Sequence, residues 1–569
     1  MTDIRRSILW VIFGFSMVLI WDKWQLYNGK PATFFPQAAP AVAAPAAGAK
    51  SPADVPAASA LPGSAVAQLP AAAAPAAPRM THTATTDVLK LTFDTEGGTL
   101  VGADILKHKE ATRSSKNQEV KPLTLLTTGT DHTYVAQSGL IGGAQAVAAL
   151  PTHKTPMTLV TADTELKDGQ DSLTVRFESA DLGGIKLVKT YTARKGGYDL
   201  TVKHEVVNTG STAVDPKLYL QLVRDGSKGA NETPFYSTFT GPAVYTNEKK
   251  YQKIEFANID KNSAEFLKTA PDGYVAMVQH YFASAWLLGE GIEREHFARK
   301  IDNNLYAVGL ITAVGTVEPG ATKAVESRLF VGPQEEKVLE QVAPGLELVK
   351  DYGWLTMLAK PLYWLLEKIH TIVGNWGWAI VLLVVLIKAA FYWLNATAYR
   401  SMAKMKAVNP RIMEMRERLK DNPQQMQQEM MKIYREEKVN PMGGCFPIMI
   451  QIPVFIALYW VLLSSVEMRN APWTLWIADL SSPDPYYILP FIMAVTTMIQ
   501  TSLNPLPPDP IQAKMMWIMP LVFSVMFFFF PSGLVMYWIT NNVLTIAQQA
   551  YINRSMGVQV KFSMPNFKS

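Results

Sequence analysis

The sequence predicts a polytopic α-helical membrane protein with six spans and a large antiparallel β-sandwich domain. Apolar residues make up 49% of its 569 residues, and charged residues only 18%, below the roughly 25% of a typical soluble protein. The last third of the chain contains several long stretches almost free of charge, whereas the region before it alternates in short runs. Together these observations predict a membrane part joined to a soluble domain.

Charge and cysteine content exclude several other classes of protein. The formal net charge of +5 is too mild to predict a nucleic-acid binder, so no DNA partner is expected. Cys445 is the only cysteine, which excludes an intramolecular disulfide, a CxxC redox motif and a zinc ribbon. No cofactor and no metal site are therefore predicted.

Residues 1–30 are predicted to form an N-terminal transmembrane anchor. Arg5 and Arg6 precede an apolar run at 8–21, an order that places the N-terminus in the cytoplasm. The run also has the length of a signal-peptide core, and the Ala-rich stretch downstream leaves removal open as an alternative. Because no small-residue cleavage site follows directly, an uncleaved anchor is favoured.

Residues 31–80 are rich in Ala and Pro and are predicted to be a disordered linker. Regular prolines prevent a continuous helix, and nothing in this stretch can bury a core.

Residues 81–345 carry the pattern of a β-sandwich. Short alternating runs are separated by Gly, Asn and Asp; in one of them Leu200, Val202 and Val206 share a strand face that His204 interrupts. Many short strands over this length predict a large antiparallel sandwich. Further candidate strands are 88–93, 172–177, 185–192, 217–223, 274–279 and 305–312.

Residues 346–375 are predicted to form an amphipathic helix on the membrane surface. Apolar residues recur at helical spacing, with charged residues between them, and Pro361 is expected to break or kink the helix.

Five further spans are predicted within residues 376–550, and alternation from a cytoplasmic N-terminus fixes their topology. The segment 396–441 carries ten basic residues and the tail 551–569 is basic, so both are expected in the cytoplasm. The loop at 466–485 contains only one basic residue, Arg469, and is expected on the outside of the membrane, as is the β-domain. The five spans are 376–394, 446–463, 486–502, 515–530 and 534–550.

These five spans contain no Asp, Glu or His, which removes the side chains that proton-coupled transport and intramembrane proteolysis usually need. The chain also lacks a GxxxxGK[ST] loop for nucleotide hydrolysis. A catalytic membrane domain is therefore not expected.

Lys388 is the charged residue of the first C-terminal span, where a lysine is costly. Snorkelling is one explanation, and interhelical hydrogen bonds are the simplest role for each polar residue in the other spans. Taken together, however, the polar residues predict a water-filled groove in the inner-leaflet half of the membrane. Its members are Lys388, Tyr392 and Asn395 on one helical face, Gln451, Thr496, Thr497 and Gln500, and Asn541, Asn542, Thr545, Gln548 and Gln549.

The cytoplasmic segment 396–441 is predicted to be a helical hairpin. Its first helix is expected to open at Pro410, and its second at Asn422, with Gln425 completing the cap. Apolar seams pack the two helices together, and their basic outer faces suit lipid headgroups or ribosomal RNA.

Four strings then carry a resemblance: residues 376–550 resemble the YidC/Oxa/Alb family of membrane protein insertases, and the whole layout resembles its Gram-negative form. The strings are Tyr399-Arg-Ser-Met-Ala-Lys-Met, Glu437-Lys-Val-Asn-Pro-Met-Gly-Gly-Cys-Phe-Pro, Asp484-Pro-Tyr-Tyr-Ile-Leu-Pro and Phe530-Pro-Ser-Gly-Leu-Val-Met-Tyr-Trp.

The resemblance implies a non-enzymatic, energy-independent insertase and folding chaperone of the bacterial inner membrane, with a periplasmic β-domain similar to sugar-mutarotase sandwiches. The implied partners are nascent membrane proteins, the Sec translocon with its accessory subunits, the lipid bilayer, and the ribosome through the hairpin and tail. Lys388 occupies the family's groove position, which usually holds arginine. The predicted client-contacting residues are Lys388, Tyr392, Gln451, Pro453, Phe527, Trp538, Asn542 and Thr545.

Two other functions remain as alternatives. A carbohydrate-binding or isomerising enzyme in the β-domain would use the exposed-looking His280, His296, Glu293 and Glu295 as acid–base groups. A passive channel or solute carrier is disfavoured, and ion conductance of the purified protein in liposomes would test it.

Overall fold

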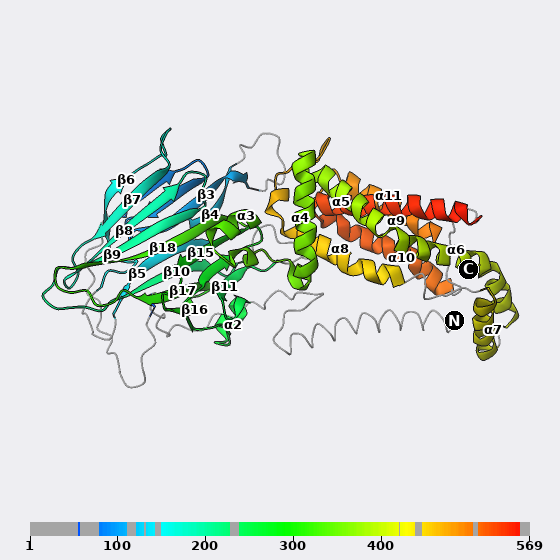
Figure 1. Ribbon diagram of the computed structural model, residues 1–569, viewed down its shortest axis with the longest axis horizontal. Helices are drawn as coiled ribbons and strands as arrows, with labels where there is room; N and C mark the ends of the chain where they lie inside the picture. Colours follow the sequence, from blue (N-terminus) through cyan, green and yellow to red (C-terminus); the bar gives the residue numbers. More distant parts are fainter. Residues whose placement is uncertain are drawn as a thin grey trace.

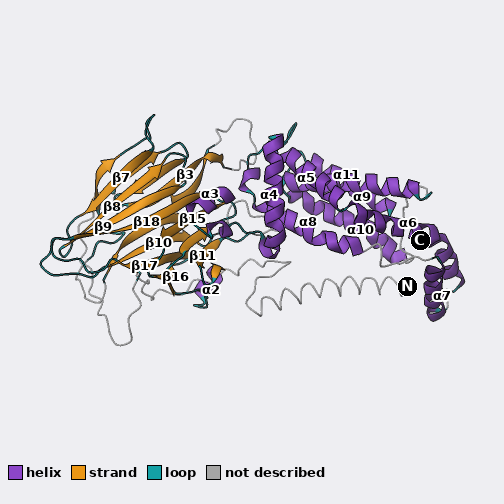
Figure 2. Ribbon diagram, in the orientation of Figure 1, coloured by secondary structure: helices purple, strands orange, loops and turns teal. Residues whose placement is uncertain are grey.

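A β-rich domain and a bundle of helices follow one another along the long axis of the computed structural model (Figures 1 and 2). The described residues are 55–56, 79–110, 121–129, 132–142, 150–227, 238–419, 422–437, 446–504 and 510–557. The expected anchor at 1–30, most of the linker at 31–80 and most of the tail lie outside them.

Eighteen strands among the described residues form two nine-stranded antiparallel sheets. In spatial order, one sheet contains β1 (Thr81–Thr85), β2 (Leu89–Asp94), β3 (Thr99–Lys109), β4 (Pro122–Thr128), β5 (Thr133–Ile141), β10 (Lys217–Asp225), β17 (Leu305–Ala313), β16 (Arg294–Asp302) and β13 (Thr269–Ala270). The other contains β12 (Lys250–Lys253), β11 (Gly241–Thr246), β14 (Tyr274–Val278), β15 (Phe282–Leu288), β18 (Thr322–Pro333), β9 (Asp199–Asn208), β8 (Ile185–Arg194), β7 (Ser172–Ser179) and β6 (Met157–Ala162). The predicted antiparallel sandwich is confirmed.

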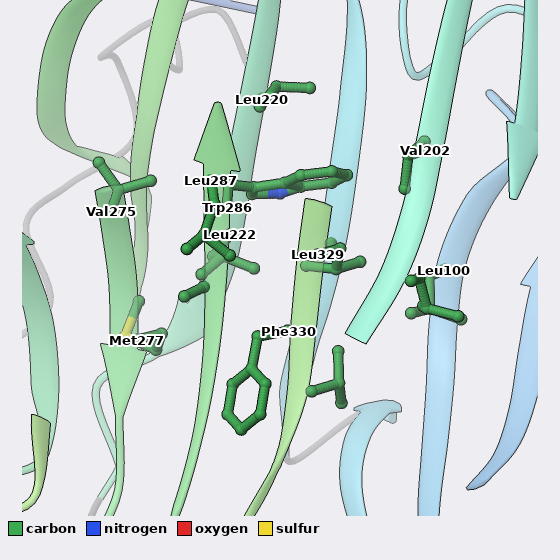
Figure 3. Packing of buried hydrophobic residues seen from close by; sticks show 14 of the residues in the cluster. Leu100, Val202, Leu220, Leu222, Val275, Met277, Trp286, Leu287, Leu329 and Phe330 are labelled. Atoms are coloured by element: carbon green, nitrogen blue, oxygen red, sulfur yellow. The ribbon is translucent and has the colours of Figure 1, made fainter. Parts of the chain in front are cut away.

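The core of this β-domain lies between the two sheets, because alternate side chains of each strand point inward. Figure 3 shows Trp286 of β15 beside Val202 of β9 and Leu220 of β10, which come from both sheets. Along β9 the buried positions include His204, whose Nε2 lies 2.9 Å from Ser138 Oγ. His204 thus lies on the same inner face as Leu200 and Val202, as the sequence indicated, and its hydroxyl partner lets the polar ring be buried there.

Helices dominate the rest of the described chain. Their bounds are α2 (Phe256–Asp260), α3 (Glu336–Val342), η1 (Leu346–Val349), η2 (Gly353–Leu355), α4 (Thr356–Val373), α5 (Trp376–Ala390), α6 (Tyr392–Arg418), α7 (Pro423–Glu436), α8 (Phe446–Ser464), η3 (Val466–Met468), α9 (Ile488–Leu503), α10 (Pro510–Met526), η4 (Phe527–Phe529) and α11 (Ser532–Ser555).

Helix α4 lies across the end of the bundle that faces the β-domain (Figure 1). Its buried side is apolar, with Ala359, Tyr363 and Leu366, whereas its exposed side carries the charged Lys368 together with the apolar Met357 and Trp364. Pro361 lies inside this helix without ending it, so the expected break at Pro361 was wrong. Pro361 is the sixth residue of α4, beyond the four amide groups that lack an intrahelical acceptor, so it costs the helix one backbone hydrogen bond. The expected kink stays a prediction.

The first C-terminal span ends earlier than the sequence indicated. Helix α5 stops at Ala390, and α6 begins at Tyr392 with its axis bent by 68°. Lys388 and Asn395 are buried, whereas Tyr392 is 44% exposed, so the predicted single face of these three residues was wrong. The bend directs α6 out of the bundle while its first turns still pack against α11.

The hairpin helix also starts elsewhere than predicted. Pro410 lies inside the 27-residue helix α6 and does not open it, because the Ala-, Met- and Lys-rich stretch before it already favours helix. The second helix begins as predicted: Asn422 Oδ1 accepts a hydrogen bond from the Gln425 amide at 3.2 Å. The two apolar seams meet in one cluster of Val408, Ile412, Met415 and Ile433.

Length and hydropathy alone identify one described helical stretch, Gln512–Phe529, that is long and apolar enough to cross a membrane. Helices α5 and α6 meet the same test only when taken together across their bend, and Gln451–Ser464 and Ile488–Leu503 are shorter apolar helices. The six-span topology stays a prediction.

Candidate functional site

A cavity of about 440 Å³ lies within the helical bundle between α8, α9, α10 and α11. A volume of this size falls within the roughly 300–1,000 Å³ of ligand pockets in proteins. Its lining residues are Phe455, Tyr459, Met493, Thr497, Met519, Pro520, Phe523, Ser524, Met526, Phe527, Phe530, Leu534 and Trp538.

Aromatic rings form one wall of the cavity. The rings of Phe527 and Trp538 have centroids 4.8 Å apart, and those of Phe455 and Trp538 4.7 Å apart. Both pairs are edge-to-face, the arrangement that aromatic quadrupoles favour. The structure therefore brings together Phe527 and Trp538, two of the residues that the sequence analysis selected from consecutive predicted spans.

The hydroxyl groups of Thr497 and Ser524 are engaged by their own helices. Thr497 Oγ1 donates to the Met493 carbonyl at 2.8 Å, and Ser524 Oγ donates to the Pro520 carbonyl at 2.7 Å. These hydroxyls have used their only proton, so the cavity suits an apolar occupant.

The outer face of α10 is apolar as well. Phe523, which lines the cavity, is 53% exposed, and the face continues along the same helix. Its other exposed members are Met515, Ile518, Met519, Leu521, Val522 and Val525. An exposed apolar patch of this extent marks a surface that contacts lipid or an apolar protein segment.

Lys388 lies on α5 against α11, with only 8% of its surface exposed. Its ammonium group donates a hydrogen bond of 2.9 Å to Thr545 Oγ1. The recorded partner is thus a neutral hydroxyl, which offsets only part of the cost of burying a charge. Two predicted client-contacting residues, Lys388 and Thr545, are in direct contact.

The predicted polar residues of α9 and α11 also meet. Asn542 Nδ2 donates to Thr497 Oγ1 at 2.8 Å and lies 3.3 Å from Thr496 Oγ1. Thr497 lines the apolar cavity, and Thr545 lies one helical turn beyond Asn542 on α11. The polar strip around Lys388 and the apolar cavity therefore share the contact between α9 and α11.

Three polar atoms near this strip are buried and have no hydrogen-bond partner among the described residues: Asn395 Nδ2, Gln549 Oε1 and Asn553 Nδ2. Buried polar groups in folded proteins are nearly always hydrogen-bonded, to protein or to ordered water. Water at this end of α11 would satisfy all three atoms.

The other residues predicted to contact the client do not line the cavity. Gln451 Nε2 is 3.5 Å from Asn541 Oδ1, a weak contact, and Pro453 lies inside α8 without lining the cavity. Tyr392 is exposed on α6, and its carbonyl is 3.5 Å from Gln548 Nε2. Sequence reasoning missed the cavity residues Phe455, Tyr459, Met519 and Phe523, although each pair has the i, i+4 spacing of one helix face.

The bundle is tightly packed at the end nearest the β-domain. A Cβ atom on Gly377 would lie 2.2 Å from the Trp473 ring, so only glycine lets α5 approach the α8–α9 connection. Beside it, Leu462, Met468 and Gly533 line a void of only about 10 Å³.

The acid–base groups considered for the β-domain are not an exposed set. His280 Nε2 lies 2.8 Å from the Leu463 carbonyl of α8, and burial lowers the pKa of His280 to about 4. His296 is 2% exposed, its Nδ1 lies 3.0 Å from the Leu267 carbonyl, and burial lowers its pKa to about 4. The expectation that both histidines are exposed was wrong, because β16 turns His296 inward and the end of α8 covers His280.

Comparison with known proteins matches both halves of the chain. Residues 81–365 match the family described as the YidC periplasmic domain, and residues 368–559 match the family described as the 60Kd inner membrane protein. The membrane protein insertase YidC of Cupriavidus metallidurans is 55% identical over 560 residues, covering 98% of this chain and 98% of that protein. The YidC of Burkholderia multivorans is 52% identical over 557 residues, covering 98% and 99%.

Solved structures are more distant. A crystal structure described as an active YidC insertase with its first transmembrane domain resolved covers 82% of this chain and 91% of its own, with 19% identity and a TM-score of 0.36. A galactose mutarotase related enzyme from Lactobacillus acidophilus covers 44% of this chain and 97% of its own, with 9% identity and a TM-score of 0.27. The sequence matches show that the chain belongs to the YidC family of inner-membrane protein insertases.

Proposed function

We propose that this protein inserts membrane proteins without an energy source, moving client transmembrane segments from a cytoplasm-open hydrophilic groove into the bilayer. Family membership supports the insertase role, and this family consists of insertases rather than enzymes. One observation carries the mechanism: the polar strip of Lys388, Thr545 and Asn542 adjoins the apolar cavity through the hydrogen bond between Asn542 and Thr497.

The two surfaces suit the two parts of a client. We expect water that enters the groove to hydrate the largely buried ammonium group of Lys388, which then attracts the acidic or polar region that precedes a transmembrane segment. Phe527 and Trp538 receive the apolar segment itself as it leaves toward lipid. Transfer of about 20 apolar residues into lipid, at roughly 0.8 kcal/mol per buried CH₂ group, outweighs the cost of moving a short polar region.

The remaining partners follow from the same role. Clients are nascent membrane proteins, inserted and folded alone or beside the Sec translocon and its accessory subunits. The basic faces of α6 and α7, with the basic tail, are the proposed contact with the ribosome. Both termini lie in the cytoplasm and the β-domain in the periplasm.

Substitution of Lys388 tests the charge. Lys388→Arg should retain insertion, because arginine keeps the charge, whereas Lys388→Ala and Lys388→Glu should impair insertion of Sec-independent clients. Insertion is measured as protease protection of a client in vesicles that contain the full-length protein. Lys323→Glu, the same charge change at an exposed position of strand β18, is the matched control and should insert normally.

Crosslinking tests the path. Photocrosslinkers placed at Lys388, Gln451 and Phe527 should capture a nascent client, and one placed at Lys323 should not. If Lys388→Glu inserted clients at the wild-type rate, the charge of Lys388 would not be needed for insertion. This would hold even if Phe527 were still crosslinked to the client.

A further inference from the structure

Residues 464–469, which begin at the last residue of α8, connect three parts of the molecule; we call this segment the 464–469 joint. Ser464 Oγ donates to the Asp351 carbonyl at 2.7 Å. Val466 is fully buried in the hydrophobic core of the β-domain, whereas Met468 is buried in the core of the helical bundle. Two residues apart, the chain is thus embedded in two different cores.

Arg469 and His280 hold this joint to the β-domain. Arg469 donates to the Lys109 carbonyl at 2.7 Å, and its guanidinium group lies 5.4 Å from the centroid of the Phe282 ring. The His280 ring meets the carbonyl of Leu463, the penultimate residue of α8, at 2.8 Å. The β-domain therefore contacts the end of α8 and the residues after it through His280, Lys109 and Phe282.

Glu467 holds the joint from the other side through a buried ion pair. Lys350 Nζ lies 3.2 Å and 3.3 Å from the two carboxylate oxygens of Glu467, and the Lys350 side chain has no exposed surface. Tyr363 of α4 donates to the same carboxylate at 2.5 Å, and Lys350 Nζ lies 4.0 Å from the centroid of the Tyr363 ring. Burial and the Glu467 charge raise the pKa of Tyr363, so its hydroxyl stays a donor.

These contacts fix three elements at one point. Lys350 comes from the connection between η1 and η2, Tyr363 from α4, and Glu467 from η3 directly after α8. A buried ion pair adds little net stability compared with an apolar pair of the same volume, but it enforces one geometry when both partners are present. The Lys350–Glu467 pair therefore serves to fix the relative positions of these three elements.

Helix α8 transmits that geometry to the cavity. Tyr459 and Phe455, which line the cavity, lie five and nine residues before the end of α8 at Ser464. At about 1.5 Å per residue they are roughly 8 Å and 14 Å from the joint along one continuous helix. A tilt of the helix end would move both rings relative to the wall formed by α10.

We propose that Glu467 is a positioning residue for client insertion: with Lys350 and Tyr363 it sets the end of α8 and thereby the aromatic wall that receives the client. This inference rests on the proposed insertase function. It assigns Glu467 no contact with the client.

Charge exchange across the pair tests the proposal in full-length protein in phospholipid vesicles. Glu467→Lys should lower the rate of client insertion roughly tenfold, because it leaves two like charges buried together. The double variant Lys350→Glu/Glu467→Lys should restore the rate to within about twofold of wild type, because the opposite charges face each other again. Glu467→Gln keeps the shape of the side chain, and its insertion rate should lie between those of the single and double variants. The control Glu326→Gln, on the exposed face of β18, should insert clients at the wild-type rate.

The distribution of client crosslinks separates positioning from loss of structure. With photocrosslinkers at Phe455 of α8 and Phe523 of α10, Glu467→Gln should lower the yield from Phe455 relative to that from Phe523. A variant that had only lost stability would lower both yields together, and that result would overturn the proposal. Glu467→Gln with wild-type rate and crosslink ratio would also overturn it, while wild-type protein without insertion would refute the proposed function instead.

Discussion

Lys388 and Thr545 show how far a charge can be buried beside a neutral partner. The Lys388 ammonium has a hydroxyl at 2.9 Å and 8% exposure. Sequence reasoning selected both residues, but it could not pair them, because they are 157 residues apart and lie on separate helices. Their contact depends on how α5 and α11 pack against each other. The spacing of residues along the sequence does not determine this packing.

We expect Thr545→Val to weaken insertion of clients with acidic leading regions, while Thr545→Ser retains it. Valine has the shape of threonine without the hydroxyl, and a hydrogen bond to a charged group contributes about 1.5–3 kcal/mol. Both variants are compared with wild type for insertion rate and for thermal unfolding in detergent. Equal insertion by the valine and serine variants would show that the hydroxyl is dispensable.

Lys189 in the β-domain is a fully buried lysine whose Nζ donates to the carbonyls of Gly97 at 2.6 Å and Ser138 at 2.7 Å. Desolvation by burial lowers its pKa to about 7. In the unfolded chain a lysine has a pKa of about 10.4, so between these values the unfolded state binds a proton that the folded state does not. Stability from this residue therefore rises as pH increases from about 7 to about 10.

Lys189→Met should remove that dependence. Between pH 7 and pH 9 the free energy of unfolding of the β-domain should rise by up to about 1.4 kcal/mol per pH unit more in wild type than in Lys189→Met. Thermal unfolding of the full-length protein, followed by near-ultraviolet circular dichroism, measures this difference. Lys323→Met, at an exposed position of β18, should keep the wild-type slope, and parallel slopes in wild type and Lys189→Met would contradict the assignment.

At the scale of elements, local signals predicted structure well where one residue acts on its neighbours. The alternation of β7, β8 and β10 located these strands within a few residues, and the Asn422 cap located the start of α7. The bend after Ala390 was not predicted, because it depends on packing against α11. The continuous helix through Pro410 was missed for another reason: the helix-favouring stretch before Pro410 outweighs the proline signal.

Asn422→Ala should destabilise α7 by about 1 kcal/mol, because the Gln425 amide loses its side-chain acceptor. Hydrogen exchange of the α7 amides measures the loss as faster exchange confined to Pro423–Glu436. Asn422→Asp keeps the acceptor and should exchange like wild type. Faster exchange in the aspartate variant as well would point to a role other than capping.

At the scale of the whole molecule, the site depends on helices far apart in sequence. Phe527 and Trp538 were identified from the resemblance, whereas Phe455 and Phe523 became visible only once α8 and α10 formed one cavity. Apolar residues in a membrane span look alike in sequence, because lipid-facing and cavity-facing positions share the same chemistry.

Deletion of residues 81–340 should leave insertion largely intact. Lys350, Tyr363 and Glu467 lie outside the deleted range, so their contacts are retained, although Val466 loses the β-domain core that covers it. Insertion assays and thermal unfolding of the truncated protein check both effects: near-normal insertion with lower stability is expected. Complete loss of insertion in a folded truncated protein would make the β-domain essential.

The close approach of Gly377 to the Trp473 ring bears on whether protons can pass this end of the bundle. A void of about 10 Å³, lined by Leu462, Met468 and Gly533, is at the lower limit for one water molecule, so this void cannot hold a file of waters. Protons need such a file to cross. If polar client segments pass through the membrane as proposed, close packing at this contact hinders the leak of protons beside them.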